Sequence, residues 1–280
     1  MKWVDRNRIP GFLAAVFLLA FFLMSFTAMQ SESDTWDEGL AIAADALRIF
    51  RGDWSIADYS PPLHTWLNAP AFHLLKPSLP PAAYLSGGES FYGGAFLYLY
   101  NDASAMLLVC RLSVLVVACV MGIFLYRWSS RLGGPWAGVM AVFLMALEPN
   151  VLTHSRIAAW DMLCTATMFI AAYGVWSWLE KPSWSMAVLA GVTFGLALIS
   201  KYTALILFPS LACGVMVYVL MKDKSVLKVS FPKNEILQAL KMLWTYFCIS
   251  ASFIEVWTIG HSCGLYIFSS VSPDLTSNSP

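Results

Sequence analysis

Charged residues are scarce in this chain of 280 residues. Only 12% of the residues are Asp, Glu, Lys or Arg, whereas about a quarter are charged in soluble domains. The formal net charge is zero, which gives no basic surface for nucleic acid, and no glycine-rich nucleotide loop occurs. With 59% hydrophobic residues and a mean hydropathy of +0.65, the sequence predicts a polytopic membrane protein.

The six cysteines form no Cys-x-x-Cys pair. Five of them lie in apolar runs, and the sixth is in the polar C-terminal stretch: Cys110, Cys119, Cys164, Cys213, Cys248 and Cys263. Such cysteines are typical of small apolar residues inside helices. The sequence therefore predicts neither disulfides nor a cysteine-bound metal.

Seven apolar stretches predict seven membrane-spanning helices. The first, 11–29, is longer than the roughly 7–15 residues of a signal-peptide core, so we expect an uncleaved span. The others are 105–126, 135–148, 162–179, 184–200, 202–221 and 236–258. The expected organisation is a cytoplasmic N-terminus with helix 1 (1–29), an outer loop (30–104), helices 2–7 (105–258) and an outer C-terminal tail (259–280).

The distribution of basic residues predicts the orientation. Lys and Arg concentrate in cytoplasmic segments of membrane proteins. Here most of them lie in the N-terminus and in 127–134, 180–183 and 222–233. Loop 30–104 instead carries nine acidic residues against three basic ones. We therefore expect this loop on the outer side.

The outer loop is too long to be a simple connector. In 37–50, apolar residues recur at helical spacing, while Asp45 and Arg48 fall on the other side. This pattern predicts an amphipathic helix lying on the membrane surface. Segment 61–75 predicts a second such helix, and the glycine-rich segment 85–94 is expected to be mobile.

Unusual polar residues converge on the outer side of the predicted topology. A charge inside the bilayer costs roughly 2.5–3.5 kcal/mol even on a lenient scale. Their common depth therefore predicts a polar site near the outer headgroups. The residues are Asp37, Glu38, Arg111, His154, Arg156, Asp161 and Lys201.

Each of these residues also fits an ordinary structural role. Thr35 and Glu38 match a capping box, in which Asp37 favours the positive helix end. The remaining alternatives are headgroup anchors (Arg111, Lys201), a helix N-cap (Asp161) and a loop residue (His154).

Together these residue types favour one chemistry. A carboxylate at the bilayer surface can act as general base on a hydroxyl, and Arg or Lys can hold a phosphate and stabilise its departing charge. A lipid-linked phosphosugar presents its phosphate at that depth, which favours glycosyl transfer. A transporter is the alternative, for which inverted repeats and deeper charges would be expected.

Five stretches carry a family resemblance when taken in order. They are WDEG (36–39), LRIFRGDWSIADYSPPL (47–63), CRLSVLVV (110–117), EPNVLTHSRIAAWDMLCTATMF (148–169) and GLALISKYTALILFP (195–209). The chain resembles the protein O-mannosyltransferase and aminoarabinose-transferase group of GT-C glycosyltransferases (family 39 and its bacterial relatives). This resemblance implies an all-α polytopic membrane protein with a GT-C-type core and interfacial helices in the first outer loop.

The resemblance also implies a reaction. A sugar, mannose or similar, passes by one inverting displacement from a polyprenyl-phosphate donor to a hydroxyl of a protein, lipid or glycan acceptor. A divalent cation that bridges the acids and the phosphate is compatible with this reaction, but no ligand set in the sequence requires one. The implied residues are Asp37 as base, Glu38 and Asp161 as further acids of the site, and Arg111 and Lys201 at the donor phosphate, to which we add Arg156 and His154.

The sequence departs from the family pattern in two respects. Ser60 stands where the family usually has His before Pro-Pro-Leu, and His64 follows instead. The family also has more membrane helices, so we expect a C-terminally truncated form, and an inactive fragment or a subunit stays an alternative. The lack of eukaryotic sorting signals favours a bacterial inner membrane over the endoplasmic reticulum.

Overall fold

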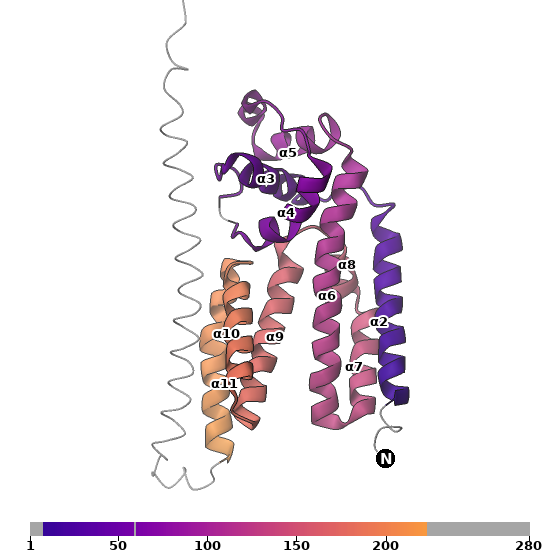
Figure 1. The fold of residues 1–280 in the computed structure, drawn as a ribbon, viewed down its shortest axis with the longest axis vertical. Helices are drawn as coiled ribbons and strands as arrows, with labels where there is room; N and C mark the ends of the chain where they lie inside the picture. Colours follow the sequence, from indigo (N-terminus) through magenta and orange to yellow (C-terminus); the bar gives the residue numbers. More distant parts are fainter. Residues whose placement is uncertain (1–7, 59, 223–280) are drawn as a thin grey trace, which may run out of the picture.

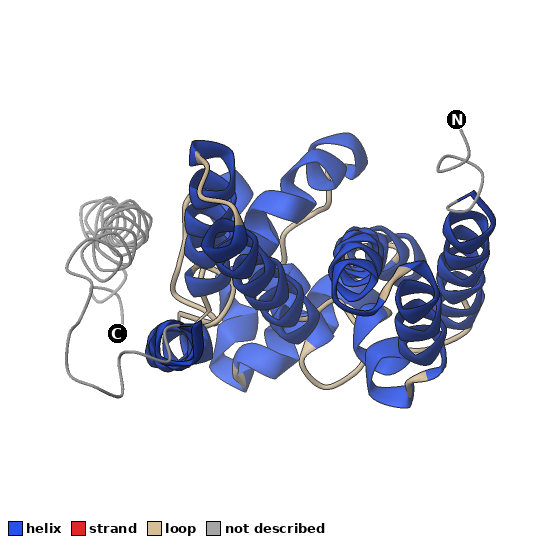
Figure 2. Ribbon diagram, turned by 90° about the horizontal axis from the view of Figure 1, so that it is seen from below, coloured by secondary structure: helices blue, strands red, loops and turns tan. Residues whose placement is uncertain are grey.

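The structure is a computed structural model that describes residues 8–58 and 60–222. Figure 2 shows that this part of the chain is all helix and loop, without a strand, which confirms the all-α prediction. The elements are α2 (Arg8–Met29), α3 (Glu38–Arg51), α4 (Leu63–Leu75), η1 (Ala82–Gly87), α5 (Glu89–Tyr98), α6 (Ala103–Gly133), α7 (Pro135–Leu147), α8 (Pro149–Ser155), α9 (Trp160–Glu180), α10 (Trp184–Leu198), η2 (Tyr202–Ile206) and α11 (Leu207–Lys222).

Three of these helices are long and apolar enough to cross a membrane, namely α2, α6 and α9. A fourth span is possible in α7 and α8 taken together, which meet at a bend of 67°. The predicted stretches 184–200 and 202–221 correspond to shorter apolar helices, and the predicted span 236–258 lies outside the described residues. The chain is thus an integral membrane protein.

The bend between α7 and α8 has a local cause. Pro149 has no backbone N–H and occupies the first turn of α8, so the helix cannot run through it unbroken. Glu148 is the N-cap of α8, and its side chain accepts a hydrogen bond from the Val151 backbone N–H at 2.6 Å. The predicted apolar stretch 135–148 therefore ends at this bend.

The spanning helices pack as neighbours in one body (Figure 1), with α2 on α6 and α7, α6 on α9, and α9 on α10. Helix α2 keeps an apolar stripe exposed at helical spacing, formed by Ile9, Phe12, Val16, Leu19 and Leu23. Such a stripe on a spanning helix suits contact with lipid chains.

Helices α3, α4 and α5 lie together at one end of the spans, as Figure 1 shows. The sequence predicts a surface helix at α3 with an exposed polar side, and this prediction is wrong because the polar side is buried. Asp45 and Arg48 were expected on the solvent side, yet they are only 1% and 6% exposed. The reason is that α4 packs on this polar side and supplies partners for both residues.

Segment 85–94 was expected to be mobile, but η1 and α5 give it helical structure. Its glycines instead allow two helices to cross closely. A Cβ atom added to Gly93 of α5 would lie 2.6 Å from the backbone carbon of Gly39 in α3. Only glycine fits at Gly93 without moving the α3 backbone.

Candidate functional site

The first feature of the site is a buried ion pair between Glu38 and Arg111. Glu38 is the first residue of α3 and Arg111 lies in the N-terminal third of α6; they are 0% and 1% exposed. Arg111 Nε donates to Glu38 Oε1 at 2.7 Å, and Nη2 donates to Oε2 at 2.8 Å. This bidentate arrangement is the strongest geometry available to an Arg and a carboxylate.

Arg111 also closes the turn between α2 and α3. Its Nη1 donates to the carbonyls of Met29 and Glu32, both at 2.9 Å, and Nη2 donates to that of Ser33 at 2.7 Å. A guanidinium has five N–H groups, and all five therefore bind protein acceptors. In this structure Arg111 has no N–H left for a phosphate, and a snorkelling position is also excluded by its burial.

Glu38 reaches two further segments. The backbone N–H of Ala158, just before α9, donates to Oε1 at 2.8 Å, and that of Thr35 donates to Oε2 at 2.8 Å. Of the predicted capping box, only the bond from the Thr35 backbone N–H to the Glu38 carboxylate is formed. The N-cap of α3 is Asp37 and not Thr35. Burial by itself raises the pKa of Glu38, but hydrogen bonds from Arg111, Ala158 and Thr35 bring the pKa below its ordinary value.

Asp37 differs sharply from its neighbour Glu38. It is exposed, and its side chain makes no hydrogen bond or ion pair with the residues that the structure describes. Trp36 on its other side is 85% exposed. The turn that Arg111 holds therefore presents a carboxylate whose oxygens are available to a substrate.

Asp161 and Lys201, which the sequence predicts on the same side of the membrane, form a second ion pair. Asp161 lies in the first turn of α9, and Lys201 follows the end of α10. Lys201 Nζ donates to Asp161 Oδ1, and the side chains are 38% and 47% exposed. Asp161 is not the N-cap of α9, a position that Ala159 occupies. Unlike the Glu38–Arg111 pair, this pair is open to a ligand.

Arg156 and His154 lie at the other connection to α9. Arg156 Nη2 is 3.1 Å from Glu32 Oε1, with 27% and 41% of the two side chains exposed. His154 is exposed in the last turn of α8. The structure thus places six of the predicted residues in contact or in adjacent segments: Glu32 binds Arg156 through its carboxylate and Arg111 through its carbonyl, and Lys201 binds Asp161. The side chains of Asp37 and His154 form no ion pair with the described residues.

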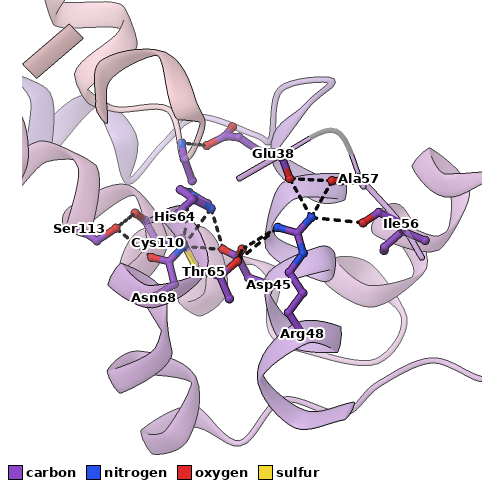
Figure 3. A network of polar contacts seen from close by, with 12 residues as sticks. Glu38, Asp45, Arg48, Ile56, Ala57, His64, Thr65, Asn68, Cys110 and Ser113 are labelled. Atoms are coloured by element: carbon purple, nitrogen blue, oxygen red, sulfur yellow. Dashed lines mark hydrogen bonds and ion pairs between the residues drawn. The ribbon is translucent and has the colours of Figure 1, made fainter. Parts of the chain in front are cut away.

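A second buried network, drawn in Figure 3, joins α3, α4 and α6. Asp45 lies 2.6 Å from His64 Nδ1 and accepts from Thr65 Oγ1 at 2.5 Å and from Asn68 Nδ2 at 2.9 Å. Ser113 of α6 donates to Asn68 Oδ1 at 2.9 Å. Burial raises the pKa of Asp45, but attraction to His64 and hydrogen bonds from His64 and Thr65 leave the pKa below its ordinary value.

Arg48 extends this network to the loop before α4 (Figure 3). It donates to Thr65 Oγ1 at 3.3 Å, to the Ala57 carbonyl at 2.6 Å and to Ser60 Oγ at 2.8 Å. Its guanidinium also lies 4.5 Å from the centre of the Trp54 ring. This arrangement fixes the loop and orients the start of α4.

This network is absent from the predictions made from the sequence, although the sequence carries a signal for it. Asp45 and Arg48 are three residues apart on α3, and His64 and Asn68 are four apart on α4. Each pair lies on one helix face. Two polar stripes on consecutive helices are therefore a pattern from which mutual burial could have been predicted.

No group of three His, Cys, Asp or Glu side chains suited to hold a metal ion occurs within residues 8–58 and 60–222.

Comparison with known proteins gives one match. Residues 95–248, more than half of the chain, match the sequence profile of the dolichyl-phosphate-mannose-protein mannosyltransferase family. This range contains the stretches 110–117, 148–169 and 195–209, whereas WDEG (36–39) and segment 47–63 precede it. No curated protein and no solved structure gives a significant match to the chain.

Proposed function

Because the chain belongs to the dolichyl-phosphate-mannose-protein mannosyltransferase family, and is thus a membrane glycosyltransferase of the mannosyltransferase type, we propose that it transfers mannose or a similar sugar from a polyprenyl-phosphate donor. The acceptor is a hydroxyl of a protein, lipid or glycan at the outer membrane face. The observation that carries this proposal is the exposed Asp37 beside the fully bound Glu38.

Asp37 is the proposed general base. It lies on a turn that is fixed from both sides, because Glu38 binds Arg111 of α6 and the Ala158 backbone before α9. A base must be held in place to be effective, yet its oxygens must stay accessible to the acceptor. Asp37 meets both conditions, whereas Glu38 meets only the first.

The proposed reaction is a single displacement. The acceptor oxygen attacks the anomeric carbon, its proton passes to a carboxylate oxygen of Asp37, and the bond from that carbon to the phosphate oxygen breaks. The electron pair of the broken bond stays on the departing polyprenyl phosphate. Attack from the side opposite to the leaving group inverts the anomeric configuration.

The leaving phosphate is assigned to Lys201 and Arg156. An ammonium has three N–H donors, and Asp161 takes one of those of Lys201 in this structure. Arg156 is partly exposed, and its ion pair with Glu32 is accessible to exchange. Arg111, which the family resemblance places near the phosphate, has its N–H groups bound to Glu38 and to backbone carbonyls, so we give it the role of holding the turn that carries Asp37.

The base is tested by Asp37→Asn, with Asp102→Asn as the matched control. Both residues are exposed at helix N-cap positions. The Asp37 side chain makes no capping hydrogen bond, and Asn caps as well as Asp at 102, so neither change should unfold the protein. We expect Asp37→Asn to lower sugar release from a polyprenyl-phosphate-mannose donor by about 10²- to 10⁴-fold, the usual contribution of general base catalysis. The control should keep the wild-type rate. Equal rates for Asp37→Asn and wild type would refute the assignment.

Two measurements test the remaining parts. Inversion is checked by the anomeric configuration of the product, determined by NMR; retention would exclude a single displacement. The outer face is checked with an epitope inserted at the exposed Gly87–Gly88, and a control epitope in the exposed turn 181–183 at the opposite end of α9. In spheroplasts, whose outer membrane face is uncovered, we expect antibody to reach the first epitope directly and the second only after permeabilisation.

A further inference from the structure

The first turn of α4 touches both segments that carry the Asp161–Lys201 pair. The backbone N–H of Leu63 donates to the carbonyl of Ile199 at 3.0 Å, two residues before Lys201. The His64 ring packs edge-on against the ring of Trp160, with centroids 6.2 Å apart, and Trp160 directly precedes Asp161. Two consecutive residues of α4 therefore contact the two backbone segments that carry the ion pair.

His64 is itself held firmly from the α3 side. It is 0% exposed, and Nδ1 lies 2.6 Å from the Asp45 carboxylate. Asp45 in turn is fixed by Thr65 and Asn68, at 2.5 and 2.9 Å. The imidazole is thus placed between a buried carboxylate and the first residue of α9, and the network in Figure 3 sets its orientation.

We propose that His64, oriented by Asp45, is a positioning residue for the Asp161–Lys201 pair. It holds the first turn of α9 through Trp160, while Leu63 holds the end of α10, so that the carboxylate and the ammonium stay in contact. The pair is partly exposed, and an exposed pair of this kind is weak by itself. Its geometry therefore depends on what holds the two backbones. The catalytic consequence of this proposal rests on the assignment of Lys201 to the donor phosphate.

The test measures the Lys201 amine directly. Wild type, His64→Phe, His64→Gln and Asp45→Asn are treated in detergent with an amine-acylating reagent, below their unfolding temperatures. Mass spectrometry then gives the acylation rate of Lys201 relative to Lys76, which is exposed at the end of α4. His73→Gln is the control, because His73 is exposed on the same helix. The ratio removes differences in reagent and in micelle.

We expect His64→Phe and Asp45→Asn to raise the Lys201 ratio roughly two- to fivefold, since a loosened ion pair leaves the Lys201 amine free of Asp161 and accessible to the reagent for more of the time. His73→Gln should leave the ratio unchanged. The same variants should raise the donor KM and lower kcat together, because misplacing a phosphate-binding group weakens both ground-state and transition-state contacts. If His64→Phe does not fold, His64→Gln and Asp45→Asn carry the test.

An unchanged Lys201 ratio in folded His64 and Asp45 variants would overturn the positioning role. This outcome is distinct from failure of the proposed function, which would appear as no sugar transfer by wild type while the acylation ratio still responds to His64. Full activity of Lys201→Met would refute only the assignment of Lys201 to the donor phosphate. A role of His64 in core packing alone would lower the unfolding midpoint of the variants without moving the ratio.

Discussion

The substitution Glu38→Gln changes a single heavy atom and tests how much the buried Glu38–Arg111 ion pair contributes to stability. Glutamine has the shape of glutamate, but one carboxylate oxygen becomes an NH₂ group and the charge is lost. Glu38 Oε1 accepts from Arg111 and Ala158, and Oε2 accepts from Arg111 and Thr35. Whichever oxygen is replaced, the NH₂ faces one N–H of Arg111 and one backbone N–H. Two of the four hydrogen bonds are lost in either orientation.

The size of the effect follows from this count. A hydrogen bond to a charged group contributes about 1.5–3 kcal/mol, so two lost bonds predict a loss of about 3–6 kcal/mol. Breaking a buried ion pair by removing one partner costs about 3–5 kcal/mol, which agrees. Glu32→Gln is the control, because the Glu32–Arg156 pair is partly exposed and exposed pairs contribute about 0–1 kcal/mol. Both changes remove one acid from the same turn.

The assay is unfolding in mixed micelles, in which the SDS mole fraction is raised and tryptophan fluorescence is followed. Glu38→Gln should unfold at a much lower SDS fraction than wild type, and Glu32→Gln close to wild type. The double variant Glu38→Met with Arg111→Met should lose less than the sum of its single changes, because no buried charge is left unpaired. Equal shifts for Glu38→Gln and Glu32→Gln would refute the claim that the buried pair holds the turn.

Two further predictions concern pH and helix crossing. The pKa values of Glu38 and Asp45 lie below their ordinary values, so their contribution to stability is complete above a pH of about 4 and is lost as the pH falls further through the lowered values. The SDS midpoint should therefore stay level from neutral pH to about 5 and fall below about 4; a decline already near neutral pH would contradict this. Gly93→Ala should lower the free energy of unfolding by about 1–3 kcal/mol through overpacking, because its Cβ would lie 2.6 Å from Gly39. Its SDS midpoint should fall accordingly. Gly94→Ala meets nothing within 4 Å and should be neutral or stabilising by up to about 1 kcal/mol, so that equal effects of the two changes would exclude a tight crossing.

The helices could be predicted from the sequence because their causes are local. Apolar runs long enough to span, such as 11–29, 105–126 and 162–179, lie within α2, α6 and α9. The break at Pro149 follows from a missing N–H.

The contacts of the site could not be predicted, because their causes are distant in sequence. Arg111 was equally suited to headgroups, to phosphate or to a carboxylate, and its partner Glu38 lies 73 residues away. Periodicity identified the polar side of α3 correctly, but not what covers it. Asp45 can be buried because Thr65, Asn68 and His64 of the next helix supply hydrogen bonds and an ion pair to its carboxylate. A hydrophobicity pattern does not show which polar residues will pair in this way.

The long sequence separation of the bonds to Glu38 also has a consequence for synthesis in the cell. Arg111 is made 73 residues after Glu38, and Ala158 is made 120 residues after it. At about 5–20 residues per second, the last partner follows roughly 6–24 s later. During this interval the turn that carries Asp37 lacks its final bond, and the carboxylate of Glu38 stays in water. The contacts that join α3 to the spans can therefore be completed only after α6 and the start of α9 have been made, which makes assembly of the site a late step of synthesis.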